Sequence, residues 1–311
     1  MDAGPSNCQR LQSIFNSAPK VKFMDGKPGC PSRDIFVVGL ATAVKQEAKT
    51  LANLLGNPVV AKIAEQVEKP DFGGSLVQTE VLPVPGASKT IKVSMLLLPE
   101  DAGRHVTKSR PDLVRQKMIG KLAKHDVWVV GEQADLHPLS MAVARCVPSF
   151  SLKEANRKIV NDAAENQDPK GQESTDVFLV STDGKDTAEF AKSFENMADA
   201  IQMAQFLVDA PPNMLTTSSF HEFAQDVVGC LDDISYTSMQ GEMLKMCGYH
   251  GIYSVGKGAA NEPVLLVFNY EPEDQDGGAP VALVGKGVTF DTGGTINEST
   301  GFYYRHVIFF E

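Results

Sequence analysis

Lys286 and Asp291 are the two residues of this chain whose types and spacing could bind a metal ion. They stand in the run VGKGVTFDTGG, residues 284–294, whose glycines let backbone or ligand approach both side chains closely. An aspartate offers a hard carboxylate oxygen to a divalent cation. A lysine joins the same coordination sphere only when it is deprotonated, which burial beside a cation favours. The spacing alone also fits a glycine-rich turn with a solvated lysine and aspartate.

The segment before this run predicts where the two side chains should lie. Pro280–Val284 is a short apolar run after the turn-rich stretch Glu271–Ala279, a pattern that favours a buried strand. Ligand sites in α/β sheets collect at the ends of strands. We therefore expect Lys286 and Asp291 just beyond the end of a buried strand.

The string VGKGVTFDTGG closely resembles the metal-binding signature of the leucyl aminopeptidase family, the two-metal cytosolic aminopeptidases. Two upstream segments, Leu207–Thr216 and Gly251–Gly258, resemble the parts of the family that lead into this signature, in the same order and at similar spacing. The resemblance covers about residues 186–294 and ends abruptly after Gly294.

This resemblance implies an enzyme that releases N-terminal amino acids from peptides, with two divalent ions, Zn or Mn, and assembly as a homo-hexamer. Lys286 matches the family's metal-coordinating lysine, and Asp291 matches the aspartate that bridges both metals. The position of the family's catalytic lysine is held here by Glu298, and the remaining metal ligands of the family would lie beyond Glu311. We therefore assign no catalytic residue to this chain, expect at most one weakly bound ion, and do not expect the hexamer.

Three functional interpretations follow from this departure. The chain is a metallo-aminopeptidase by descent that is itself inactive, or a catalytically dead regulatory or assembly-competing subunit, or an unstable product. The divergent tail, residues 295–311, is consistent with a truncated form, whether biological or an artefact of the gene sequence. It includes His306, which we interpret as an incidental residue of an aromatic segment and not as a substitute ligand.

The composition excludes several other classes of function. A net charge of −10 over 311 residues disfavours nucleic acid or an anionic membrane as the main partner. The sequence has neither a secretory signal pattern nor an apolar run long enough to cross a membrane. Its five scattered cysteines are typical of reduced thiols, so we expect a cytoplasmic protein.

The alternation of apolar runs predicts an α/β fold in three parts. These are an N-terminal α/β domain with a mixed sheet, residues 1–183, a connecting helix, residues 184–208, and the incomplete start of a catalytic domain, residues 209–311. We expect the first part to fold alone and the last part to associate through its uncovered apolar strands. Strands are expected at residues 34–39, 91–98, 126–130, 176–181, 263–269 and 280–284. Helices are expected at residues 41–55, 111–125, 141–146 and 187–208, with a further helix to Val228 capped by Ser219 and Glu222.

Overall fold

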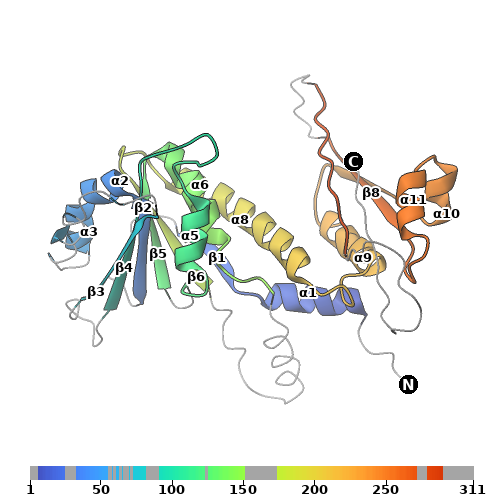
Figure 1. Cartoon of the computed structure of the whole chain (residues 1–311), viewed down its shortest axis with the longest axis horizontal. Coiled ribbons are helices and arrows are strands. Elements are labelled where there is room, and N and C mark those ends of the chain that lie inside the picture. Colours follow the sequence, from blue (N-terminus) through green and yellow to red (C-terminus); the bar gives the residue numbers. More distant parts are fainter. Residues whose placement is uncertain are drawn as a thin grey trace, which may run out of the picture. The chain divides into compact units, whose positions relative to one another are not determined.

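The computed structural model divides the chain into two compact units, residues 17–208 and residues 1–16 with 209–311 (Figure 1). Each unit is described by itself below. The domain boundaries drawn from the sequence, at residues 183 and 208, stay predictions. The structure describes residues 6–24, 33–54, 58, 61–62, 65, 70, 73–81, 91–122, 125–150, 174–271 and 279–289.

The larger unit is built on a six-stranded mixed sheet with the strand order β1-β6-β5-β2-β4-β3. All neighbouring pairs are parallel except β3 with β4, which is antiparallel. The central strands are continuous apolar runs because a parallel sheet is buried on both faces. The strands are β1 (Lys20–Met24), β2 (Asp34–Leu40), β3 (Ser75–Val81), β4 (Ile91–Leu98), β5 (His125–Gly131) and β6 (Ser174–Ser181).

Helices of the larger unit cover this sheet and form one core with it. Trp128 of β5 and Phe36 of β2 are among the largest fully buried side chains. Helix α6 contacts both β5 and β6, and α2 contacts β2. The helices are α2 (Ala41–Gln46), α3 (Ala48–Leu54), α5 (Pro111–Met118), α6 (Gln133–Ala144) and α8 (Ala188–Asp209).

The α/β class and the expected strands of this unit are confirmed, whereas three helices differ from expectation. The helix expected at residues 111–125 ends at Met118, two residues before Gly120, whose φ is 72°. The helix expected at residues 41–55 is interrupted at Glu47, so that α2 and α3 are separate. The helix expected at residues 141–146 begins eight residues earlier, at Gln133, and contains Pro138. Proline removes one backbone hydrogen bond from a helix interior. Burial of Leu136 and Leu139 on the same helix supports the turn around it.

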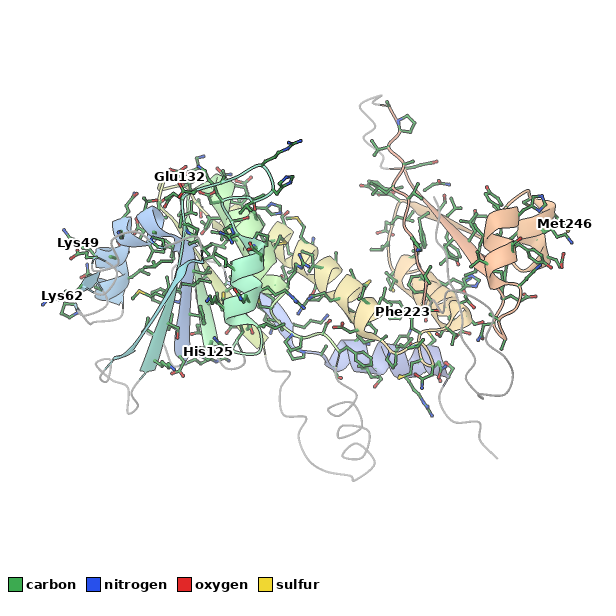
Figure 2. All side chains as sticks on the ribbon, viewed as in Figure 1. Lys49, Lys62, His125, Glu132, Phe223 and Met246 are labelled. Atoms are coloured by element: carbon green, nitrogen blue, oxygen red, sulfur yellow. The ribbon has the colours of Figure 1, made fainter. Side chains whose placement is uncertain are left out.

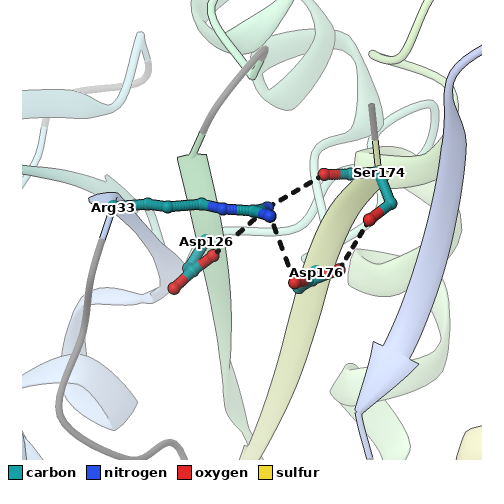
Figure 3. Close-up of polar contacts among 4 residues, drawn as sticks. All are labelled: Arg33, Asp126, Ser174 and Asp176. Carbon is teal, nitrogen blue, oxygen red and sulfur yellow. Dashed lines mark hydrogen bonds and ion pairs between the residues drawn. The ribbon is translucent and has the colours of Figure 1, made fainter. Parts of the chain in front are cut away.

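The guanidinium of Arg33, just before β2, links the N-terminal ends of the parallel strands β5 and β6 to that of β2 (Figure 3). Nη1 of Arg33 donates to the carbonyl oxygen of Ser174 at 3.1 Å and lies 3.5 Å from Oδ2 of Asp176. The same nitrogen lies 3.8 Å from Oδ1 of Asp126, and the sheet register places Asp126 directly opposite Asp176. Like charges opposite one another on neighbouring strands are destabilising, so Arg33 offsets a repulsion that the register creates.

Asp126 gives this edge a testable pH dependence. Burial raises the pKa of its carboxyl, Asp176 raises it further, and Arg33 and His125 oppose the rise. Because the folded-state pKa lies above the unfolded value, the folded state binds the proton more tightly. This contribution to stability is therefore full below the unfolded pKa and is lost as pH rises through the folded pKa.

We expect Asp126→Asn to raise the melting temperature at pH 7 by about 1–4 °C and to change it little at pH 3. The control is Asp112→Asn, because a hydrogen bond from Arg110 lowers the pKa of Asp112. The ionised Asp112 carboxylate therefore stabilises the folded state at pH 7, whereas the ionised Asp126 carboxylate destabilises it. The Asp112→Asn variant should melt lower than the parent at pH 7. Scanning calorimetry at both pH values measures this, and a lower melting temperature for Asp126→Asn at pH 7 would contradict it.

The smaller unit contains a two-stranded antiparallel sheet, β7 (Ile234–Gln240) with β8 (Val264–Tyr270). Helix α9 (Thr217–Val228) packs on one face, where Ala224 contacts the buried residues Val264 and Leu266. On the other face lie α10 (Glu242–Met246) and α11 (His250–Gly256), which share a second buried cluster with Leu265. The strand expected at residues 263–269 is therefore confirmed.

The cap of α9 differs from the one expected. Ser219 is the third helical residue, and its hydroxyl accepts the backbone N–H of the N-cap residue Thr216 at 2.8 Å. The Thr216 hydroxyl accepts the backbone N–H of Ser219 in return, at 3.2 Å. The capping box is thus Thr216 with Ser219 and does not involve Glu222, although the helix ends at Val228 as expected.

Helix α1 (Asn7–Ser17) belongs to the smaller unit except for its last residue. The Cys8 thiol lies 3.7 Å from Oδ2 of Asp226 on α9, and the Gln12 amide donates to the same oxygen. The ring of Phe15 meets that of Phe223 edge-on at 6.2 Å, and Figure 2 shows Phe223 on α9. Burial, reinforced by Asp226 and Glu222, raises the pKa of Cys8 to about 11. Helix α1, near the start of the chain, therefore packs against α9 of the smaller unit.

None of the helices formed by the described residues is both long enough and apolar enough to span a membrane.

Candidate functional site

The segment that carries Lys286 is not the buried strand that the sequence predicts. Among the described residues, 279–289 contain no strand, and three apolar side chains that should be buried are exposed: Val281 by 85%, Leu283 by 71% and Val284 by 63%. A strand needs a neighbour to receive its backbone hydrogen bonds. The sheet of this unit pairs β7 with β8 and leaves the segment without a ladder, so the expectation was wrong.

The two expected metal ligands have different outcomes. Lys286 lies in this extended segment, and its side chain is exposed. A metal-binding lysine must lose its proton, and burial would favour that loss. The structure therefore does not bury Lys286 as the predicted site requires. Asp291 lies outside the described residues, as does Glu298, so their predicted roles stay predictions.

The described residues do not fit a dinuclear metal centre. Within the ranges that the structure describes, no three His, Cys, Asp or Glu side chains lie close enough together to hold a metal ion. Two divalent cations a few Å apart need several carboxylates to offset their mutual repulsion. Lys286 and Asp291 together supply one carboxylate, so we derive no catalytic step through bound metals.

The run GIYSVGKG, residues 251–258, has the glycine and lysine spacing of a phosphate-binding loop but lacks the Ser or Thr that follows the lysine there. In the structure this run has a packing role instead. Residues 250–256 form the helix α11, whereas a phosphate-binding loop must remain open around its ligand. A Cβ on Gly256 would lie 2.4 Å from Cβ of Pro263, the residue before β8. Glycine is therefore required where α11 meets the start of β8.

His221 is a histidine of the smaller unit with a shifted pKa, and no sequence pattern pointed to it. Its ring lies 6.0 Å from that of Tyr236, and burial lowers its pKa while Glu222 opposes the change. The lowered pKa favours the neutral form of the imidazole. It forms no cluster with other described metal-ligating side chains, so it gives the candidate site no further ligand.

Comparison with known protein families finds a catalytic-domain model that is similar to the part of the chain around the candidate segment. Residues 202–300 match the model described as the catalytic domain of the cytosol aminopeptidase family. This range contains both Lys286 and Asp291, the family-like position Glu298, and all of β7, β8 and the helices α9 to α11.

Known relatives and solved structures agree with this match. The human "Probable aminopeptidase NPEPL1" is 33% identical over 170 residues, which are 54% of this chain and 30% of that protein. Leucyl aminopeptidase from Trypanosoma brucei, solved with actinonin, is 30% identical with a TM-score of 0.69 and covers 92% of this chain and 55% of its own. The Leishmania major enzyme is 26% identical with a TM-score of 0.73, covering 92% of this chain and 53% of its own. The chain thus spans about a third of that curated relative's length and little more than half of those solved chains.

Proposed function

We propose, since all three comparisons support the leucyl aminopeptidase family for this chain, that it descends from metal-dependent enzymes that release N-terminal residues from peptides. The observation that carries the proposal is the family match over residues 202–300, which contains Lys286 and Asp291. We further propose that the 311-residue chain by itself is not active. The support is the presence of Glu298 where the family has its catalytic lysine, together with the exposure of Lys286.

The family's metal chemistry sets what this chain would have to supply. Bound metals in a two-metal hydrolase activate a water molecule and polarise the peptide carbonyl. Lys286 and Asp291 would be this chain's contribution to such a centre, and their charge and ligand number suit at most one weakly bound ion. We assign the protein to the cytoplasm and name peptides as the substrates of the family, in keeping with its description as cytosol aminopeptidases.

Metal titration tests this proposal directly. Calorimetry of the metal-free chain with Mn²⁺ or Zn²⁺ should give no more than one site, with a dissociation constant of about 10⁻⁴ M or weaker, comparable to weak carboxylate sites for divalent cations. Asp291→Ala should abolish that binding, and Asp233→Ala, at an aspartate of the same unit far along the chain from the signature, should leave it unchanged. Two ions bound at micromolar affinity would contradict the proposal.

A second candidate function is that of a catalytically dead regulatory or assembly-competing subunit. The exposed apolar side chains Val281, Leu283 and Val284 favour it, because exposed apolar segments recruit other chains. Under this proposal, adding the chain to an active family member during assembly lowers the yield of active enzyme. Unchanged activity of that enzyme at a tenfold excess of the chain would reject this candidate.

A further inference from the structure

We propose that the full chain forms a two-fold symmetric dimer in which the free edge of β8 pairs antiparallel with β8 of a second copy. The proposal concerns association and does not depend on the proposed catalytic descent. It gives the four-stranded order β7-β8-β8′-β7′, where the primes mark the second copy.

The second half of β8 is the part of the strand that lacks cover. Its buried half, Val264–Leu266, is at most 2% exposed, whereas Phe268 is 38% and Tyr270 is 67% exposed. Among the described residues, β8 pairs only with β7, and no described strand uses the backbone groups of its other edge. A two-stranded sheet is marginal in water, and an open edge beside apolar side chains is a template for another strand.

The composition of the two strands selects β8 as the edge that pairs. The sequence of β8, VLLVFNY, has no charge and no proline and is rich in residues that favour strands. The sequence of β7, ISYTSMQ, is also uncharged, but it contains more polar residues than β8, namely two serines, a threonine and a glutamine. A copy of β8 is therefore the occupant that covers apolar side chains without burying a charge.

The register follows from where the exposure lies. Antiparallel pairing centred on Phe268 joins Leu266–Tyr270 to the same residues of the second copy and places each exposed Tyr270 opposite Leu266′. Glu262 and Glu271 remain outside the paired residues, so no carboxylate is buried by the pairing. Pro263 and Pro272 flank the strand and limit how far the ladder can extend.

The covering helices are compatible with this arrangement. Helix α9 packs over both β7 and β8, so its copy would lie about two strand spacings away, roughly 9–10 Å. That is the usual distance of about 8–10 Å between packed helices. An isologous contact of this kind uses up both β8 edges, so the assembly closes at two copies instead of growing into a filament.

The contact area indicates the strength of the dimer. An aromatic side chain offers roughly 150–250 Å² when fully covered, so Phe268 and Tyr270 together leave roughly 200 Å² uncovered per copy. A stable interface needs about 800 Å² per partner. Backbone pairing and the contact between the α9 helices must supply the rest, so we expect dissociation constants of about 1–50 µM, in the weaker range for small interfaces.

Sedimentation equilibrium of the full chain tests the proposal. We expect a monomer–dimer equilibrium in the micromolar range. Tyr270→Lys places a charge on the paired edge and should weaken the dimer at least tenfold. The matched control is Met246→Lys on α10, a residue that is 85% exposed and is labelled in Figure 2; it should change the dissociation constant less than twofold.

A cross-linking measurement keeps the test decisive if Tyr270→Lys does not fold. In a chain that carries Cys30→Ser, Cys230→Ser and Cys247→Ser, the thiols introduced by Phe268→Cys should form a disulfide-linked dimer on mild oxidation. Ser235→Cys on β7 should not. A chain that stays monomeric at 100 µM, open-ended assemblies, equal effects of the two lysine variants, or cross-linking only through position 235 would each overturn the proposal.

Discussion

The full chain is expected to release no leucine from leucyl p-nitroanilide above the level of a Lys286→Ala, Asp291→Ala double variant. The reason is the number of charge-stabilising groups that the site lacks. Removing a single such group from an active site costs about 10²–10³ in rate. Here Glu298 reverses the charge at the position of the family's catalytic lysine, and residues 292–311 contain neither a lysine nor an aspartate.

The geometry of the described residues leads to the same expectation. Lys286 is exposed on a segment that forms no strand, so nothing in the described part of the chain holds it in a ligand position. Catalytic groups must be held within a fraction of an Å of their productive positions, and a misplacement of about 1 Å can cost 10²-fold. Together these losses should lower the turnover rate below the detection limit of a sensitive chromogenic assay.

The assay is run with Mn²⁺ and with Zn²⁺, beside an active leucyl aminopeptidase as the positive control. Glu298→Lys is the sharpest companion variant, because it restores the family's residue at one position only. It should remain inactive, since the other ligands are still lacking. Turnover that depends on added metal and disappears in the double variant would show that this chain builds a site from residues other than those assigned.

Local sequence patterns predicted the larger unit well because its strands are determined by local composition. The runs DIFVVGL and IKVSMLLL are apolar throughout, which is what burial on both faces of a parallel sheet requires. Helix α6 was placed too late because Pro138 is a strong local signal for a helix boundary. Burial of Leu136 and Leu139 outweighs that signal, and burial depends on residues far away in the sequence.

The smaller unit was harder to predict because its decisive contacts are non-local. The apolar run Pro280–Val284 has the composition of a buried strand, but a strand also needs a partner, and composition does not reveal one. Helix α1 joins α9 across more than 200 residues, through Cys8 and Gln12 with Asp226. The identities of Lys286 and Asp291 could be taken from the string VGKGVTFDTGG, whereas the exposure of Lys286 could not.

A fragment of residues 17–208 is expected to fold alone with one cooperative thermal transition. The sequence patterns predict the same of residues 1–183, but the packing of α8 leads us to expect that this shorter fragment has no such transition. The difference is α8, which contributes the buried residues Phe194 and Phe206. The Phe194 ring meets that of Phe23 on β1 edge-on at 5.8 Å, and Phe206 lies 5.4 Å from Phe150. Without α8, the partners of both rings become exposed.

The free energy lost with α8 is comparable to the whole stability of a domain. Replacing one buried phenylalanine by alanine costs about 3–5 kcal/mol, and a whole domain is stable by only about 5–15 kcal/mol. Loss of both rings with the rest of α8 therefore removes most or all of the stability of the shorter fragment. The shorter fragment also retains α1 without α9, so that Leu11 and Ile14 lose the unit in which they are buried.

Single substitutions in the longer fragment separate the packing of α8 from mere chain length. Phe194→Ala should lower its melting temperature by about 6–20 °C, at roughly 2–4 °C per kcal/mol for a domain of this size. The control is Lys192→Ala, two residues away on the same helix, whose side chain is 80% exposed. It should shift the melting temperature by less than about 2 °C, as surface substitutions usually do. Equal shifts for the two variants, or a cooperative melt of residues 1–183 at the temperature of the longer fragment, would mean that α8 is not part of the core that stabilises this unit.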